Sequence, residues 1–188
     1  MKTFAPQLNH GFSLIEILVS MVVLVIGLLG FASLLVNSNK AEMESYQRVQ
    51  ALILMQDITD RINTNRKVAS CYVTSNATGV GTGYSDTPVC VAGSVEQQAR
   101  AVADLTAWNV ALQGAAETKS GGNVGAMIGA RGCVTYDTVA KQYTVTVAWQ
   151  GLSDTAAPAA GLTCGNGLYG TTAKRRVVSS VLSIADLS

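Results

Sequence analysis

The sequence has few of the side chains that enzymes depend on. It contains one histidine, His10, so the chain beyond that point cannot form a Ser-His or Cys-His catalytic pair. No Gly-rich phosphate-binding pattern follows a predicted strand. The carboxylates of Asp86, Asp137 and Asp154 fall in predicted loops without a motif around them. The sequence therefore predicts a protein that is not an enzyme and that uses no cofactor and no metal.

Charge is scarce as well. Asp, Glu, Lys and Arg make up 13% of the residues, and the net charge is +1. Basic residues are neighbours only at Arg66-Lys67 and at Lys174-Arg175-Arg176. Because neutralising phosphates requires a clustered basic face, direct binding to nucleic acid is not expected. Abundant Gly, Ala, Ser and Thr suit an exported bacterial surface protein.

None of the four cysteines lies in a C-x-x-C pair. A zinc site would need all four as ligands at long and irregular spacings. An even number in an exported chain instead favours disulfides, for which three pairings are open. We favour Cys71–Cys90 and Cys133–Cys164, because these pairs are near neighbours in sequence and each closes a Gly-rich loop. Closing such a loop reduces the entropy of the unfolded chain.

One long apolar run stands near the N-terminus. Phe12 to Val36 comprises 25 residues with a single charge, Glu16. As a helix it would be about 37 Å long, which is enough to cross the hydrocarbon core of a membrane. An ordinary signal peptide has a shorter apolar region followed by small residues. An uncleaved signal anchor remains an alternative for this segment.

Glu16 is the unusual feature of this run. A carboxylate five residues into an apolar helix is costly, so it is a candidate functional group that needs a partner. Cleavage between Gly11 and Phe12 would create an α-amino group four residues before it. That amine could pair with Glu16 within one helix or between neighbouring copies. A carboxylate that merely reaches for the membrane edge is the third alternative.

The residues around this charge form a specific motif: Gly11, Phe12, Ser13, Leu14, Ile15 and Glu16. The motif, joined to its apolar helix, resembles the signature of the type IV pilin superfamily. The resemblance implies that a prepilin peptidase cuts after Gly11 on the cytoplasmic side and N-methylates Phe12. It also implies that Glu16 neutralises the amine of an adjacent subunit. Two departures are His10, where the family usually has Lys or Arg, and Ser33, where major pilins often carry Pro.

Beyond Val36 the apolar residues recur at helical spacing, so one helix is predicted from about Phe12 to Thr64. Glu44–Arg48 and Asp57–Arg61 are expected i,i+4 ion pairs on its surface. A Gly/Ser/Thr-rich loop is predicted from Ala69 to Gly93.

Ser94 then opens a second helix, because Ser94-x-x-Gln97 has the form of a capping box and Gly114 suits the residue after a helix end. Trp108 on this helix is expected to anchor the packing. Strands are predicted at 133–136, 143–149 and 175–184, the second with strict alternation. The fold class is therefore α+β, a long N-terminal helix packed against a small antiparallel sheet of three or four strands.

Three regions follow from this reading. Residues 1–11 would be a cleavable leader, 12–36 a transmembrane and filament-core helix, and 37–188 the amphipathic half of the helix with a globular α+β head. The spacing Asp104-x-x-x-Trp108-x-x-x-Leu112, followed by the later strands, is similar to the PilV-type minor pilins.

That resemblance implies a minor pilin that primes assembly of a type IV pilus and sits at or near its tip, with roles in adhesion, twitching motility and DNA uptake. The implied partners are other minor pilins, the major pilin, the prepilin peptidase, the inner-membrane assembly platform and a large tip adhesin. The chain would sit in the inner membrane with its head in the periplasm, and in the extracellular pilus after assembly. The alternatives are a minor pseudopilin of a type II secretion system and, more remotely, a signal-anchored receptor domain.

Overall fold

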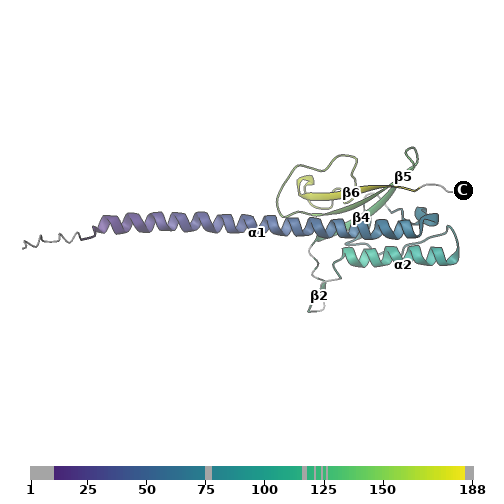
Figure 1. Ribbon diagram of the computed structural model, residues 1–188, viewed down its shortest axis with the longest axis horizontal. Helices are drawn as coiled ribbons and strands as arrows, with labels where there is room; N and C mark the ends of the chain where they lie inside the picture. Colours follow the sequence, from purple (N-terminus) through teal and green to yellow (C-terminus); the bar gives the residue numbers. More distant parts are fainter. Residues whose placement is uncertain are drawn as a thin grey trace, which may run out of the picture. The chain divides into compact units, whose positions relative to one another are not determined.

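The computed structural model describes residues 11–74, 78–115, 118–120, 122–123, 125 and 127–184 (Figure 1). The chain forms two compact units, Met1–Glu42 and Met43–Ser188. The helices are α1 (Leu14–Thr64) and α2 (Val95–Leu112), with 3-10 turns η1 (Arg66–Tyr72) and η2 (Thr172–Lys174). The strands are β1 (Val80–Gly81), β2 (Thr118–Lys119), β3 (Gly122–Asn123), β4 (Ile128–Asp137), β5 (Gln142–Gln150) and β6 (Arg175–Ser183).

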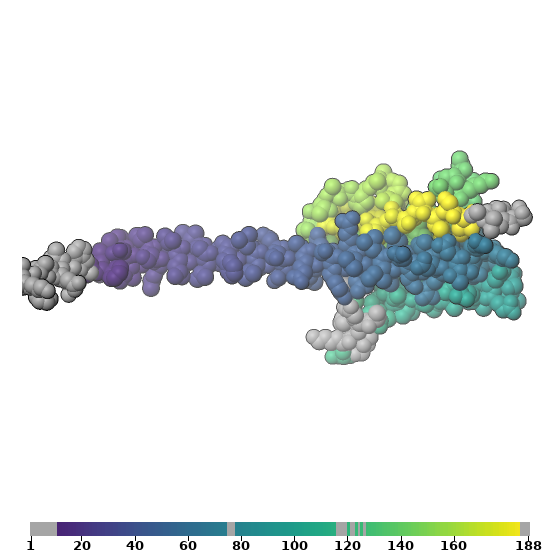
Figure 2. Space-filling view, viewed as in Figure 1, coloured from purple at the N-terminus to yellow at the C-terminus, as the bar shows by residue number. Residues whose placement is uncertain are grey.

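Helix α1 runs without a break from Leu14 to Thr64, in agreement with the single long helix predicted from the sequence. It contains no proline, and its two glycines, Gly27 and Gly30, are compatible with a continuous helix. All residues from 11 to 42 are exposed in the first unit (Figure 2). This part of α1 is therefore uncovered, and it is predominantly apolar as far as Val36.

In the second unit, one stripe of α1 is buried. Its buried members are Gln47, Ala51, Ile58 and Ile62, which recur at spacings that keep them on one side of a helix. The three apolar members join a single core with residues of α2 and of the sheet. The head is therefore organised around the second half of α1, as the amphipathic pattern predicts.

The main sheet is antiparallel with the strand order β1-β4-β5-β6. Strand β5 alternates as predicted, and the side chains of Val145, Val147 and Trp149 enter the core. Ala148 on the opposite face is also buried, in a second cluster with the Cys133–Cys164 disulfide. A separate hairpin pairs β2 with β3.

Helix α2 has the predicted ends. The side-chain oxygen of Ser94 accepts from the backbone N–H of Gln97, and the Gln97 side chain accepts from the backbone N–H of Ser94, which completes the capping box. Gly114 follows the helix with a φ of 77°, a conformation that glycine adopts without a steric penalty. Trp108 is fully buried. The α+β fold predicted from the sequence is confirmed.

Two details of the fold differ from the prediction. The expected loop from Ala69 to Gly93 begins inside η1 and contains the short strand β1. Strand β4 begins at Ile128 and not at Cys133. Strand β1 has only two residues, and it exists because it pairs with Gly132 and Arg131 of β4, which are distant in sequence. The same pairing involves the part of β4 before Cys133, which the sequence pattern did not indicate.

Candidate functional site

The first candidate site is the beginning of α1. Gly11, Phe12 and Ser13 precede the helix, and Phe12 is 81% exposed. The backbone carbonyl of Ser13 accepts hydrogen bonds from the N–H groups of Glu16 and Ile17, at 3.0 and 3.3 Å. Glu16 therefore lies in the first turn of the helix, where the helix dipole favours a negative charge.

The carboxylate of Glu16 lies in apolar surroundings. A shallow cleft beside it is lined by Phe12, Ile17, Ser20, Met21 and Leu24. Within the described part of the chain, no hydrogen bond or ion pair reaches this carboxylate, whereas the Glu16 backbone carbonyl accepts from the Ser20 hydroxyl at 2.6 Å. In the intact chain the nitrogen of Phe12 is a peptide nitrogen and not an amine, so it offers the Glu16 carboxylate no charged partner. Residues 1–10 of the expected leader, including His10, lie outside the described residues.

The apolar run continues this site along the helix. Helix α1 is long and apolar enough to cross a membrane, and none of its most apolar window is buried. The helix passes through Ser33 without interruption. The surface from Phe12 to Val36 is therefore available for lipid or for other apolar helices.

The second candidate feature is Glu44, near the start of the second unit. The sequence predicts a pair with Arg48, and that prediction is wrong. The carboxylate oxygen Oε1 accepts from the backbone N–H groups of Leu152 and Ser153 at 3.1 and 3.0 Å, and from the Ser153 hydroxyl at 2.8 Å. It also forms an ion pair with Arg176 at 3.2 Å. Four donors from distant parts of the chain therefore replace the local partner.

These contacts lower the pKa of Glu44. Desolvation alone would raise it, but the hydrogen bonds from Ser153, the charge of Arg176 and the Leu152 N–H together prevail. A carboxylate with a lowered pKa stabilises the fold above its unfolded pKa, near 4.5, and loses that contribution as the pH falls through its folded value.

We expect Glu44→Gln to destabilise the head at pH 7 and to matter less as the pH falls through the lowered pKa of Glu44, where the wild-type carboxylate becomes protonated. Thermal unfolding of both detergent-solubilised chains between about pH 3 and pH 7 measures the difference. Arg48→Gln is the matched control, because Arg48 forms no ion pair with Glu44 in the described part of the chain and its substitution should leave the pH profile unchanged. A constant difference between Glu44→Gln and wild type across this range would contradict the assignment.

A buried polar group joins α1, η1 and α2. The hydroxyl of Tyr72 donates to Asp104 Oδ2 at 2.6 Å, and Arg61 donates to Asp104 Oδ1 at 2.9 Å. Arg61 also forms an ion pair with Asp57, which confirms the i,i+4 pair that the sequence predicts. Burial, followed by the hydrogen bond to Asp104, raises the pKa of Tyr72, so this hydroxyl stays a donor. No sequence signal pointed to Tyr72, because its partner lies 32 residues away.

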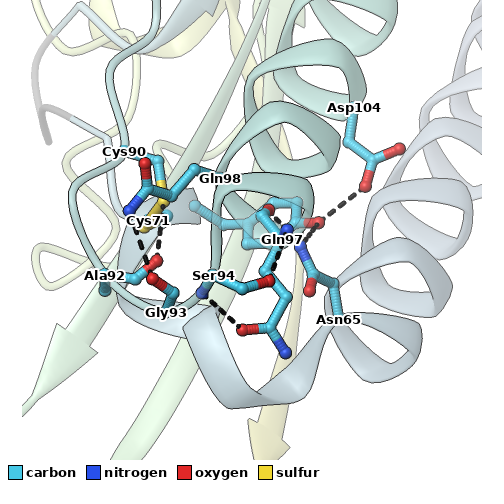
Figure 3. The surroundings of a disulfide bond; sticks show 10 residues. Asn65, Cys71, Cys90, Ala92, Gly93, Ser94, Gln97, Gln98 and Asp104 are labelled. Carbon is cyan, nitrogen blue, oxygen red and sulfur yellow. Dashed lines mark hydrogen bonds between the residues drawn. A yellow bond between two sulfur atoms is a disulfide. The ribbon is translucent and has the colours of Figure 1, made fainter.

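The head contains two disulfide bonds. They join Cys71 to Cys90 and Cys133 to Cys164, with Cα atoms 5.0 and 5.9 Å apart. These are the pairs favoured from the sequence, and they leave no cysteine thiol among them for a zinc site. Figure 3 shows the first disulfide beside the capped start of α2, where Asn65 donates to the Gln97 carbonyl at 2.9 Å.

The second disulfide lies in the cluster on the far face of β5. Tyr169 closes this cluster, and its hydroxyl donates to the Gly129 carbonyl at 2.9 Å. Burial raises the pKa of Tyr169 to about 12. Within the described ranges, no three His, Cys, Asp or Glu side chains come together in a way that could hold a metal ion.

Comparison with known protein families gives two matches, one to the N-terminal region of the chain and one to the region that follows it. Residues 7–32 match the model of the prokaryotic N-terminal methylation motif, and residues 33–106 match the model of type IV pilin Tt1218. The two matches adjoin, and the first contains the Gly11-to-Glu16 motif. No curated protein and no solved structure matches the chain.

Proposed function

Because this chain belongs to the type IV pilin superfamily, we propose that it is a minor pilin, which primes assembly of a type IV pilus and is incorporated at or near its tip. Members of this superfamily are structural subunits and not enzymes. The chain is anchored in the membrane through its N-terminal helix, and its assembly involves other pilins and a prepilin peptidase.

The observation that carries the proposal of a minor subunit is the uninterrupted course of α1 through Ser33. Subunits that build the bulk of such a filament usually have a helix-breaking proline at this place, and this chain has none. The likeness of the α2 pattern Asp104, Trp108 and Leu112 to PilV-type minor pilins supports the same proposal, since all three residues are buried on one side of α2.

We further propose that the peptidase cuts between Gly11 and Phe12 and that Phe12 is then N-methylated. The bond lies ahead of the helix, and both residues are exposed. The new amine of one subunit would then pair with Glu16 of its neighbour, and this pair would set the register between helices. The apolar surface of residues 12–36 would leave the lipid and pack against equivalent helices.

The two disulfides support a head that faces the periplasm, because such bonds persist in oxidising compartments. The proposed partners there are other minor pilins, the major pilin and a large tip adhesin, with the assembly platform in the inner membrane. After assembly the protein would be extracellular.

Deleting the gene tests this proposal against a minor pseudopilin of a type II secretion system, which would share the leader and the helix. We expect piliation and twitching to fall sharply and protein secretion to continue. The wild-type chain supplied in trans should restore piliation, and a Val139→Ala chain, altered at a 92% exposed side chain, should restore it equally. Normal piliation with lost secretion would assign the chain to the secretion system instead.

A further inference from the structure

Strand β6 forms an open edge of the main sheet. It is the last strand in the order β1-β4-β5-β6, and it pairs with β5 over its whole length without a register shift. From Val177 to Ser183 it contains no charged residue and no proline. Proteins usually protect such an edge with charge, proline, bulges or a short strand. The edge of β6 has none of these devices over that stretch.

The register shows which backbone groups point outward from β6. The N–H of Thr74 donates to the carbonyl of Val134, so Val134 turns its backbone groups away from β5. Val134 lies opposite Val145, which therefore faces β6 and bonds to its partner Ser180. Since the direction alternates, the outward groups belong to the odd-numbered residues Val177, Ser179, Val181 and Ser183. Within the described ranges, no backbone hydrogen bond reaches these outward groups.

A cleft of about 380 Å³ adjoins the Arg176 end of this edge. Its wall from α1 carries Glu44, Ser45 and Arg48, and its wall from the sheet carries Trp149 and the first residues of β6. Figure 2 shows β6 in yellow at the surface, next to the second half of α1 in blue.

Arg48 is the available donor of the cleft. The Nε1–H group of Trp149 also lacks a hydrogen-bond partner among the described residues, but this atom is buried and is not accessible from the cleft. The guanidinium of Arg48 is exposed and makes no hydrogen bond or ion pair within the described part of the chain. Arg176, in contrast, is committed to Glu44 and to the carbonyls of Ala173 and Ser153. The cleft is therefore suited to an acceptor, and the free guanidinium favours a carboxylate.

We propose that the outer edge of β6 and this cleft together bind an extended segment of another protein of the assembly. The segment would add as a fifth strand beside β6 and place an acidic side chain in the cleft, paired with Arg48. Main-chain hydrogen bonds would supply the affinity, and the acidic residue would fix the register. The docking site itself is independent of the proposed function. Only the assumption that the partner belongs to a type IV pilus rests on that function.

A second copy of this chain fits the site less well. In a two-fold dimer the two β6 strands would run antiparallel, which brings the Arg48 end of one copy to the Ser183 end of the other. The described acid at that end is Asp137, which lies on β4, two strands in from the edge, and whose Oδ1 already accepts from the N–H groups of Val139 and Ala140. It is therefore poorly placed to pair with Arg48 of a second copy. A segment of different sequence can supply the carboxylate.

The test places a photo-crosslinking amino acid at Ser179 of the full-length chain in cells, with Val139 in the exposed β4–β5 turn as the control position. We expect an adduct at Ser179 that maps by mass spectrometry to one extended segment containing Asp or Glu, and none of that kind at Val139. Val181→Pro removes an outward N–H and leaves the inward ladder of Ser180 and Leu182 in place, so it should abolish the adduct. Val181→Thr keeps the N–H and should retain the adduct.

Reversing the charge tests the cleft separately and does not depend on a proline variant. Arg48→Glu should lower the adduct yield about tenfold, and Lys in place of the mapped acid of the partner should restore it. An adduct that survives Val181→Pro, one that maps to a second copy of this chain, or the lack of any adduct at Ser179 would overturn the proposal. A mapped segment from a secretion-system protein would support the docking site and refute the pilus assignment.

Discussion

Replacing Glu16 by Gln is expected to lower incorporation of the protein into filaments by at least about a hundredfold. Glu16 is the single charge between Phe12 and Val36, and its carboxylate has no partner within the described part of the chain. In a filament, the neutral amide of the variant would leave the amine of a processed neighbour buried and unpaired. Removing one member of a buried ion pair costs about 3–5 kcal/mol, and each 1.4 kcal/mol is about a factor of ten.

Membrane insertion should not change in this variant, because the apolar run loses its only charge. Quantifying the protein in sheared pili and in membranes separates the two effects. Ser20→Ala is the matched control, since it removes only the hydrogen bond to the Glu16 backbone carbonyl and should assemble normally. Glu16→Asp keeps the charge and should retain part of the incorporation. Normal incorporation of Glu16→Gln would show that the carboxylate pairs with nothing in the filament.

Replacing Trp108 by Ala is expected to destabilise the head by about 3–5 kcal/mol, which lowers Tm by about 6–20 °C. The indole is fully buried and its Nε1–H donates to the Leu54 carbonyl at 2.9 Å, so it joins α2 to α1. It also covers Gly132 of β4, where a Cβ would come within 2.3 Å of the ring. Thermal unfolding of the detergent-solubilised chain measures the loss.

A double-mutant cycle sharpens this test. Gly132→Ala should destabilise the wild type, because the new methyl meets the indole, and should cost much less in the Trp108→Ala chain, which has room for it. If Gly132→Ala lowered the free energy of unfolding equally in the wild-type and Trp108→Ala chains, Trp108 and Gly132 would not pack together. Val110→Ala on the exposed side of α2 is the control and should change Tm little.

The elements that the sequence predicted well are those whose signals are local. Helix α1 has an unbroken helical pattern, α2 carries a capping box at Ser94 and a glycine after its end, and β5 alternates strictly. In each case the deciding residues lie within one or two turns of one another. The Asp57–Arg61 pair was predictable for the same reason.

The features that sequence reasoning missed depend on distant partners. Glu44 does not pair with Arg48. Its carboxylate instead accepts hydrogen bonds from Ser153 and Arg176, which are more than a hundred residues away in sequence and come close only when the sheet has formed. Strand β1 is too short to have a pattern of its own and forms only against β4. The motif around Glu16 was recognisable from the sequence, whereas the partner proposed for its carboxylate belongs to a neighbouring subunit.

Mass spectrometry of purified, sheared pili tests the central claim most directly, because it reads the N-terminus and the abundance of the protein together. If the chain is a processed minor pilin, its N-terminal peptide begins at N-methylated Phe12 and is present at a small fraction of the amount of the major pilin. A peptide that begins at Met1, or the absence of this chain from the pili, would contradict the account.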